Sequence, residues 1–130
     1  MTREEEIREY TIYEDVNVKG ETIYVNSKKE EFTTVDGICI NGLYYTTSTT
    51  RYVQVVHVDK EKGYVFFKCV TGYHMGIYWK CNIEPFKRQF FIRPQKKSTT
   101  SVGGCVNVVI DKDFNILKRN LNIKLEGNNR

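Results

Sequence analysis

Histidines and carboxylates are the residue types in this chain that could carry acid–base chemistry. His57 lies two positions before Asp59 in an apolar segment, so a strand would point both side chains to one face. An aspartate can orient a histidine base, but no serine or cysteine stands in a recognisable nucleophile context beside this pair. Most acids lie near the N-terminus or at loop tips, where carboxylates are solvated. The sequence therefore predicts no enzyme, and it places His57 at the surface or edge of a sheet.

The cysteines and glycines show no pattern for a metal or a cofactor. Cys39, Cys69, Cys81 and Cys105 are 30, 12 and 24 residues apart, without the paired spacing of a zinc site. We expect them to be buried free thiols, which behave as small apolar residues. The glycine-rich segment 102–105 precedes a predicted strand, so it lacks the helix N-terminus that binds phosphate. No metal and no cofactor are predicted.

A basic and aromatic segment over residues 86–97 is the candidate for nucleic-acid binding. Its cations could follow phosphates while its phenylalanine rings stack on bases, as small barrels do with single strands. Aromatic residues at 73, 78 and 79 would extend the platform. The net charge of +4 is small for a nucleic-acid binder. The candidate binding residues are Tyr73, Tyr78, Trp79, Lys87, Arg88, Arg93, Lys96 and Lys97.

The aromatic content favours protein–protein contacts over the other functions. Nine Tyr, seven Phe and one Trp exceed what one small core requires, and Tyr and Trp are enriched at interface hot spots. We therefore predict a non-catalytic binding protein that acts through protein–protein contacts, as an inhibitor or an assembly component, with self-association included. Single-stranded nucleic-acid binding through residues 87–97 is the first alternative. Binding of a small ligand is the second.

The charges are distributed unevenly along the chain. Residues 1–36 hold five basic and ten acidic residues, whereas residues 80–130 hold eleven basic and four acidic ones. Such an asymmetry can orient a head-to-tail assembly or steer a charged partner. The acidic N-terminus has no apolar stretch behind it, and the longest apolar run, Tyr64–Phe67, is far too short to span a bilayer. We expect a cytoplasmic protein without a membrane partner.

A length of 130 residues predicts one domain. The capping-box pattern Thr2–Glu5 predicts a short, marginal helix within residues 1–9. Segments rich in Tyr, Ile, Val and Thr alternate with Gly, Asn and Asp turns over residues 10–125 and predict about nine or ten short strands. Residues 126–130 are expected to fray. The predicted fold is all-β and antiparallel, either an SH3-like barrel or an elaborated barrel or sandwich.

Two segments define this β domain best. The clearest hairpin joins 51–58 to 64–70 through a polar loop that ends at Gly63. One helical turn is predicted near 85–89, because proline suits the first turn of a helix and apolar residues at 83, 86 and 90 would face one core. The residues expected in the core include Val53, Val55, Val65, Phe67 and Trp79.

The order of elements over Arg51–Pro94 is a long hairpin, a further strand, one helical turn and a short final strand. It resembles the SH3-like small-barrel fold, and the segment Lys80–Phe90 is similar to the closing segment of small barrel proteins encoded by phages. This resemblance covers about a third of the chain. It implies a viral or mobile-element origin, with the host cytoplasm or the virion as location for a phage-encoded chain, and it implies no catalytic or binding residue.

Overall fold

The computed structural model describes residues 8–45, 52–71, 76–93 and 104–120. These residues form ten strands, and all the strand pairs are antiparallel. The predicted all-β class is therefore confirmed. Residues 8–10 are helical, as expected for the end of an N-terminal helix. Residues 1–7 and the predicted frayed tail lie outside the described residues.

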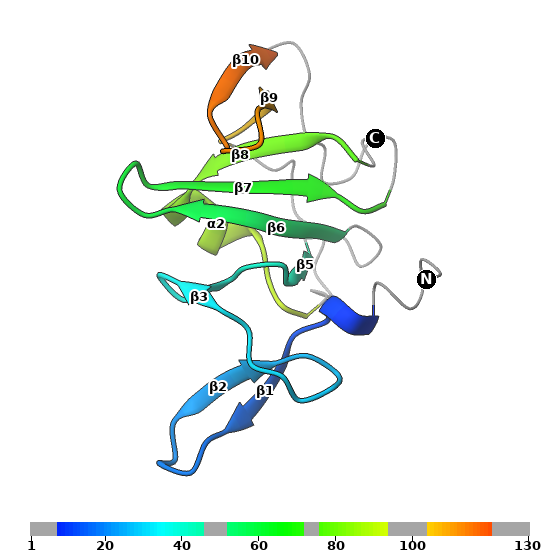
Figure 1. The fold of residues 1–130 in the computed structure, drawn as a ribbon, viewed down its shortest axis with the longest axis vertical. Helices are drawn as coiled ribbons and strands as arrows, with labels where there is room; N and C mark the ends of the chain where they lie inside the picture. The colour runs from blue at the N-terminus through cyan, green and yellow to red at the C-terminus, as the bar shows by residue number, and fades with distance from the viewer. Residues whose placement is uncertain (1–7, 46–51, 72–75, 94–103, 121–130) are drawn as a thin grey trace.

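A six-stranded sheet forms the body of the molecule (Figure 1), and each strand pairs with its neighbours in the sequence. Its strands, in spatial order, are β5 (Leu43–Tyr45), β6 (Tyr52–Asp59), β7 (Tyr64–Cys69), β8 (Tyr78–Asn82), β9 (Cys105–Ile110) and β10 (Ile116–Asn120). Among the described strands β5 and β10 do not pair with each other, so the sheet is open. The predicted closed barrel is thus not formed in the described part of the chain.

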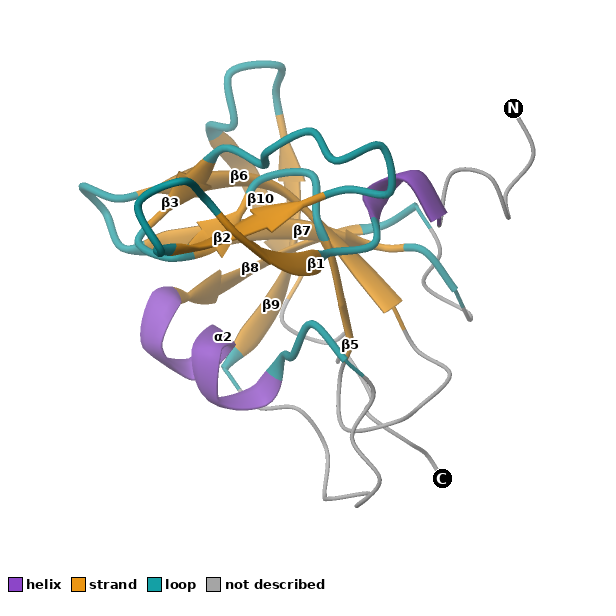
Figure 2. Cartoon of the chain, turned by 90° about the horizontal axis from the view of Figure 1, so that it is seen from below, coloured by secondary structure: helices purple, strands orange, loops and turns teal. Residues whose placement is uncertain are grey.

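One face of this sheet carries the core. Helix α2 (Ile83–Gln89) follows β8 directly and packs against β7 and β8 (Figure 2). It begins two residues before Pro85 and is longer than the single turn predicted. The helix can begin before the proline because, in the first helical turn, proline removes only an N–H that has no partner within the helix. The rings of Phe86 and Phe90 stack at 4.5 Å and both lie close to Phe67.

The residues predicted for the core are buried on this face, namely Val53, Val55, Val65, Phe67 and Trp79. A bulge in β6 between Val55 and His57 shifts the alternation, so that Val58 also faces the core. Without the bulge, the two-residue period of the strand would turn Val58 to the other face.

The opposite face of the sheet has a smaller aromatic cluster. The turn between β9 and β10 places the ring of Phe114 parallel to His57 at 4.4 Å, and both rings lie 6.0 Å from Phe66, which is 1% exposed. Lys80 is also covered here, with its Nζ 4.0 Å from the centre of the Tyr64 ring. The body therefore has apolar packing on both faces.

The N-terminal third forms a hairpin that projects from the lower end of the body (Figure 1). It consists of β1 (Tyr13–Val16), a turn and β2 (Thr22–Val25), and we call residues 13–25 the arm. A second, very short hairpin of β3 (Thr34–Val35) and β4 (Ile38–Cys39) lies between the arm and the sheet. Two sheets of two strands thus connect to one sheet of six.

Candidate functional site

The arm has a turn that its own sequence specifies. The side-chain oxygen of Asn17 accepts hydrogen bonds from the backbone N–H groups of Lys19 (2.9 Å) and Glu21 (3.0 Å), and the Asn17 amide donates to the Glu21 carboxylate (2.9 Å). Gly20 takes a positive φ of 83°, which glycine adopts without steric cost. These local bonds hold the tip of the arm although the sheet of the body does not cover it.

The surface of the arm is apolar and acidic. Every residue of β1 is exposed, including Tyr13 at 43% and Val16 at 62%, and Val18 at the tip is fully exposed. Between the tyrosine and the first valine lie Glu14 and Asp15. Single apolar residues scattered over a protein surface are ordinary. Three on one projecting hairpin form an exposed apolar patch that packing within the chain does not explain.

The base of the arm is fixed to the body. Ile12, directly before β1, is fully buried, and its side chain fills the space beside Gly42, where a Cβ would lie only 2.6 Å from Ile12 Cδ1. Glu14 approaches Arg93, with Oε1 3.6 Å from Nη2, and links the arm to the chain after α2. The arm is therefore a projection with a firm base.

A cavity of about 410 Å³ lies between the arm and the body. It is lined by Cys39 and Tyr44, together with residues 90–93, which follow α2 in the sequence. The backbone N–H of Cys39 donates a hydrogen bond of 2.9 Å to Tyr44 Oη. Burial raises the pKa of the Cys39 thiol from 9.0 to about 11, and burial together with the nearby thiol raises the pKa of Tyr44. Both groups are therefore protonated at neutral pH.

The basic segment that suggested nucleic-acid binding is divided by the fold. Phe86 and Phe90 are buried in the core at 1% and 3% exposure, so their rings cannot receive bases. Two cations of this segment lie beside acids of the N-terminal third. Lys87 Nζ is 3.7 Å from the Asp36 carboxylate, and Arg93 faces Glu14 of the arm. This arrangement lowers the positive potential that a phosphate chain would meet.

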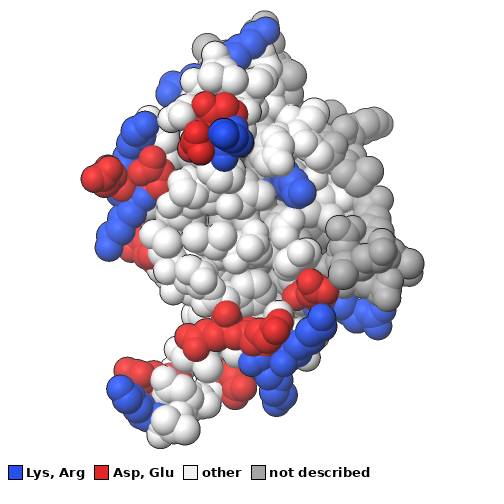
Figure 3. Space-filling model, in the orientation of Figure 1, with Lys and Arg blue, Asp and Glu red and all other residues white. Residues whose placement is uncertain are grey.

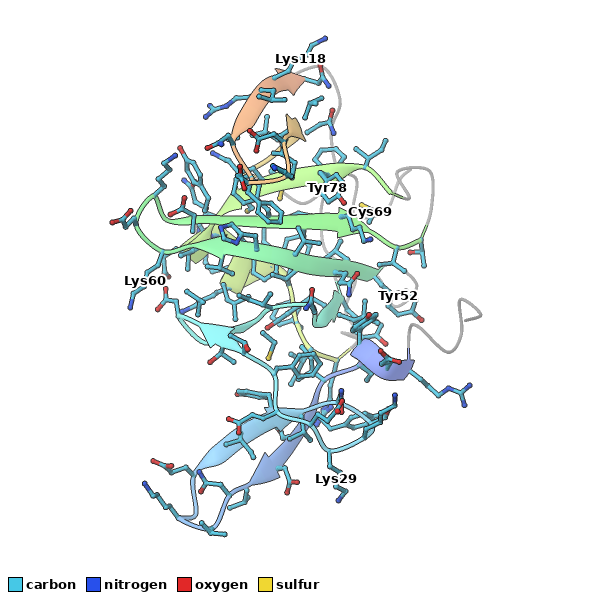
Figure 4. All side chains as sticks on the ribbon, in the orientation of Figure 1. Lys29, Tyr52, Lys60, Cys69, Tyr78 and Lys118 are labelled. Carbon is cyan, nitrogen blue, oxygen red and sulfur yellow. The ribbon has the colours of Figure 1, made fainter. Side chains whose placement is uncertain are left out.

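The other candidate binding residues have different positions. Trp79 is fully buried in the core face, and this corrects the prediction that it contacts a partner. Tyr78 is half-buried at the start of β8 (Figure 4) and Arg88 is exposed on α2. Tyr73, Lys96 and Lys97 lie outside the described residues. The predicted platform of adjacent rings is therefore not assembled from residues 78, 79, 86 and 90.

The residues considered for catalysis have structural roles. His57 is stacked against Phe114, and the carboxylate of Asp59 accepts a hydrogen bond from the backbone N–H of Lys62 at 3.1 Å in the β6–β7 turn. The four cysteines form no disulfide, and Cys81 lies opposite Cys105 across β8 and β9, where the two thiols share a hydrogen bond. Among the described residues no group of three or more His, Cys, Asp or Glu is arranged to hold a metal ion.

The end of the body opposite the arm carries a second exposed strand. β10 pairs only with β9 among the described strands, and Leu117 is 64% exposed where its register shifts. Val109 of β9 is 46% exposed, and Lys118 and Arg119 are exposed beside these apolar residues. Lys118 lies at the upper extreme of the molecule, far from Lys29 below the arm base (Figure 4).

Sequence reasoning missed the exposed residues of the arm and of β10. It weighed rings and cations, whereas the exposed apolar residues here are mostly aliphatic. Two signals were present. The segment Tyr13–Val16 places two acids between apolar residues, and Leu117–Arg119 joins a leucine to two cations. These two segments follow the charge asymmetry of the chain, because acids predominate in residues 1–36 and cations in residues 80–130. Charged side chains of both signs lie around the rim of the viewed face and leave its centre largely uncharged (Figure 3).

Comparison of the chain with protein-family models, with curated proteins and with solved structures gives no match in any of the three. No helix in the described part of the chain is long and apolar enough to cross a membrane.

Proposed function

We propose that the protein is a non-catalytic binding protein whose arm makes protein–protein contacts, as an inhibitor or an assembly component. The observation that carries this proposal is the exposure of Tyr13, Val16 and Val18 on a hairpin whose turn is held by hydrogen bonds and whose base is packed against the body. Apolar and aromatic side chains on a pre-ordered surface lose little entropy on binding, so they suit a protein partner.

The charges of the arm support a protein partner rather than a nucleic acid. Residues 13–25 contain three acids, Glu14, Asp15 and Glu21, and one lysine. An acidic hairpin repels a phosphate backbone, whereas it can steer a basic protein surface into place. The fold also buries two phenylalanines of the nucleic-acid candidate, which leaves fewer rings for stacking on bases.

The experiment is affinity capture with two matched forms of the protein, each offered to nuclease-treated lysate and to a tagged second copy. One form is the wild type. The other carries Val16→Ser and Val18→Ser, which remove apolar side chains from exposed positions and leave the turn bonds of Asn17 intact. We expect the wild type to retain a protein partner and the variant to lose it.

A control variant, Lys60→Ser in the β6–β7 turn, changes an exposed residue far from the arm and should behave as the wild type (Figure 4). Retention that is equal for all three forms, or no retention of either a lysate protein or a second copy, would contradict the proposal. Retention that disappears only after nuclease treatment would instead support the nucleic-acid alternative.

A further inference from the structure

The two exposed strands lie at opposite ends of the long axis of the molecule (Figure 1). β1 lies at the lower end, in the arm, and β10 lies at the upper end of the sheet. A contact between them within one chain is therefore excluded by distance. A contact between two chains would leave a free β1 on one copy and a free β10 on the other.

The side chains of these two strands are complementary. β1 has the sequence Tyr-Glu-Asp-Val and β10 has Ile-Leu-Lys-Arg-Asn. Both strands are exposed along most of their length, and each pairs with one neighbour only among the described strands. An exposed strand of this kind is a template for pairing with another chain. The acids of β1 match the cations of β10 in number and sign, and each strand has an exposed aliphatic residue beside its charges. Glu14 faces Arg93 of its own chain at 3.6 Å, so pairing exchanges this exposed contact for one with the partner.

We propose that the arm binds a second copy of this chain by pairing its β1 antiparallel to β10 of that copy, a proposal that rests on the arm being a protein-binding element. In the register that matches the side chains, Val16 lies opposite Leu117, Glu14 opposite Arg119 and Asp15 opposite Lys118, with Tyr13 opposite Asn120. Residues directly opposite each other share a face of the sheet. One face of the contact therefore holds an aliphatic pair and an ion pair, and the other face holds the second ion pair.

Two features of β1 bear on how this pairing forms. The backbone N–H of Asn17 donates to the carbonyl of Glu21, directly before β2, so by strand alternation the backbone groups of Glu14 and Val16 point away from β2 and toward an incoming strand. The N–H of Val16 is occupied by the Asp15 carboxylate at 2.8 Å. Pairing exchanges this local bond for one to the partner and frees Asp15 for Lys118. The same bond keeps the edge satisfied in the unbound chain.

The resulting contact is head-to-tail, because it joins two different surfaces. Contacts of this type build rings when the rotation closes and open filaments when it does not. The chain is therefore expected to form assemblies larger than a dimer as its concentration rises. Because two of the proposed pairs are ionic and exposed, association should weaken as salt increases.

The test uses sedimentation velocity on the full chain, whose monomer has a mass of 15.3 kDa. One variant carries Glu14→Lys and Asp15→Lys, and a second carries Lys118→Glu and Arg119→Glu. Each places like charges opposite each other, and we expect each to raise the dissociation constant by about tenfold or more. An equimolar mixture of the two variants restores opposite charges at both kinds of contact, so it should assemble again. A chain with all four substitutions should assemble by itself.

The outcomes separate this inference from the proposed function. A wild type that stays monomeric at millimolar concentration overturns assembly between copies, while arm-dependent capture of a lysate protein would leave the proposed function standing. Assembly that neither charge variant weakens overturns the β1–β10 contact, and so does a mixture that remains monomeric. Because the mixture and the fourfold variant use the same substitutions, recovery in them shows that the loss in each single variant is not misfolding.

The register has its own test by oxidative cross-linking of mixed variants. Val16→Cys in one copy should join Leu117→Cys in another if the strands pair antiparallel. In a parallel arrangement Val16→Cys would join Asn120→Cys instead. Preferential formation of the first product supports the register, and preferential formation of the second overturns it. Wild-type protein mixed with Val16→Cys shows whether the native thiols contribute.

Discussion

The arm and the β6–β7 hairpin use the same local turn chemistry and have opposite surroundings. In the arm the N–H of Gly20 donates to the carbonyl of Asn17 at 3.0 Å, and in the body the N–H of Gly63 donates to the carbonyl of Asp59 at 2.8 Å. An Asn or Asp side chain accepts further backbone N–H groups in each turn. Yet β6 and β7 are each paired on both sides and α2 packs against β7, whereas β1 is exposed throughout.

This difference shows which features decide whether a hairpin is buried. β6 and β7 supply valine and phenylalanine to one face, and that face is large enough to form a core with α2. β1 has two consecutive acids between its two apolar residues and offers no continuous apolar face. Two strands alone are marginally stable in water. The arm therefore depends on its turn and on its base at Ile12, and its exposed residues are free to serve binding.

The largest effect on stability is expected in the core of the body. Trp79→Ala removes a fully buried ring between β7 and β9 and should lower the free energy of unfolding by about 3–5 kcal/mol. Urea denaturation followed by far-UV circular dichroism measures this change. A loss below about 1 kcal/mol would mean that the core face collapses around the missing ring or that the ring is not covered.

The joint between arm and body should respond to overpacking. Gly42→Ala places a methyl group 2.6 Å from Ile12 Cδ1 and should cost about 1–3 kcal/mol, since the buried isoleucine has to move. Ile12→Val removes that Cδ1 atom, so the double variant should recover part of the loss. Equilibrium unfolding of the two single variants and the double variant gives their coupling energy. Strictly additive losses would show that the two residues do not share this contact.

A third turn of the same kind tests how the second face of the body is held. Phe114 takes the positive-φ position between β9 and β10, at φ 64°, where the arm has Gly20. Phe114→Ala should cost about 1–2 kcal/mol through the lost contacts with His57 and Phe66. Phe114→Gly should be about 1 kcal/mol more stable than the alanine variant, because glycine relieves the left-handed backbone. If thermal denaturation ranks alanine above glycine, backbone strain is not significant at this turn.

The smallest effect on stability is expected at the tip of the arm. Val18→Ser replaces a fully exposed side chain and should change the free energy of unfolding by no more than about 0.5 kcal/mol. The comparison of arm and body predicts that such a change affects binding and not folding. Chemical denaturation is again the measurement. A destabilisation of about 2 kcal/mol would show that Val18 is packed within the chain and would remove it from the binding surface.

The sequence by itself determined the local elements, because their signals are hydrogen bonds and spacings among near neighbours. The hairpin 51–58 with 64–70 appears close to its predicted bounds, and the helix predicted near 85–89 is present as Ile83–Gln89. The turn at Asp59–Gly63 follows from its own polar side chains, and the five core residues follow from alternation and apolar character. The charge asymmetry of the chain was also visible without a structure.

Only the tertiary structure decided which residues remain at the surface. Phe86, Phe90 and Trp79 looked equally suitable for stacking on a ligand, but α2 packs on the sheet and buries all three. Whether Val16 or Leu117 is covered depends on which faces other segments reach, and near-neighbour spacing carries no information on that. Near-neighbour spacing likewise does not show which strands lie at the edges of the sheet. Local chemistry specifies a strand, whereas long-range packing decides whether its edge and faces meet protein or solvent.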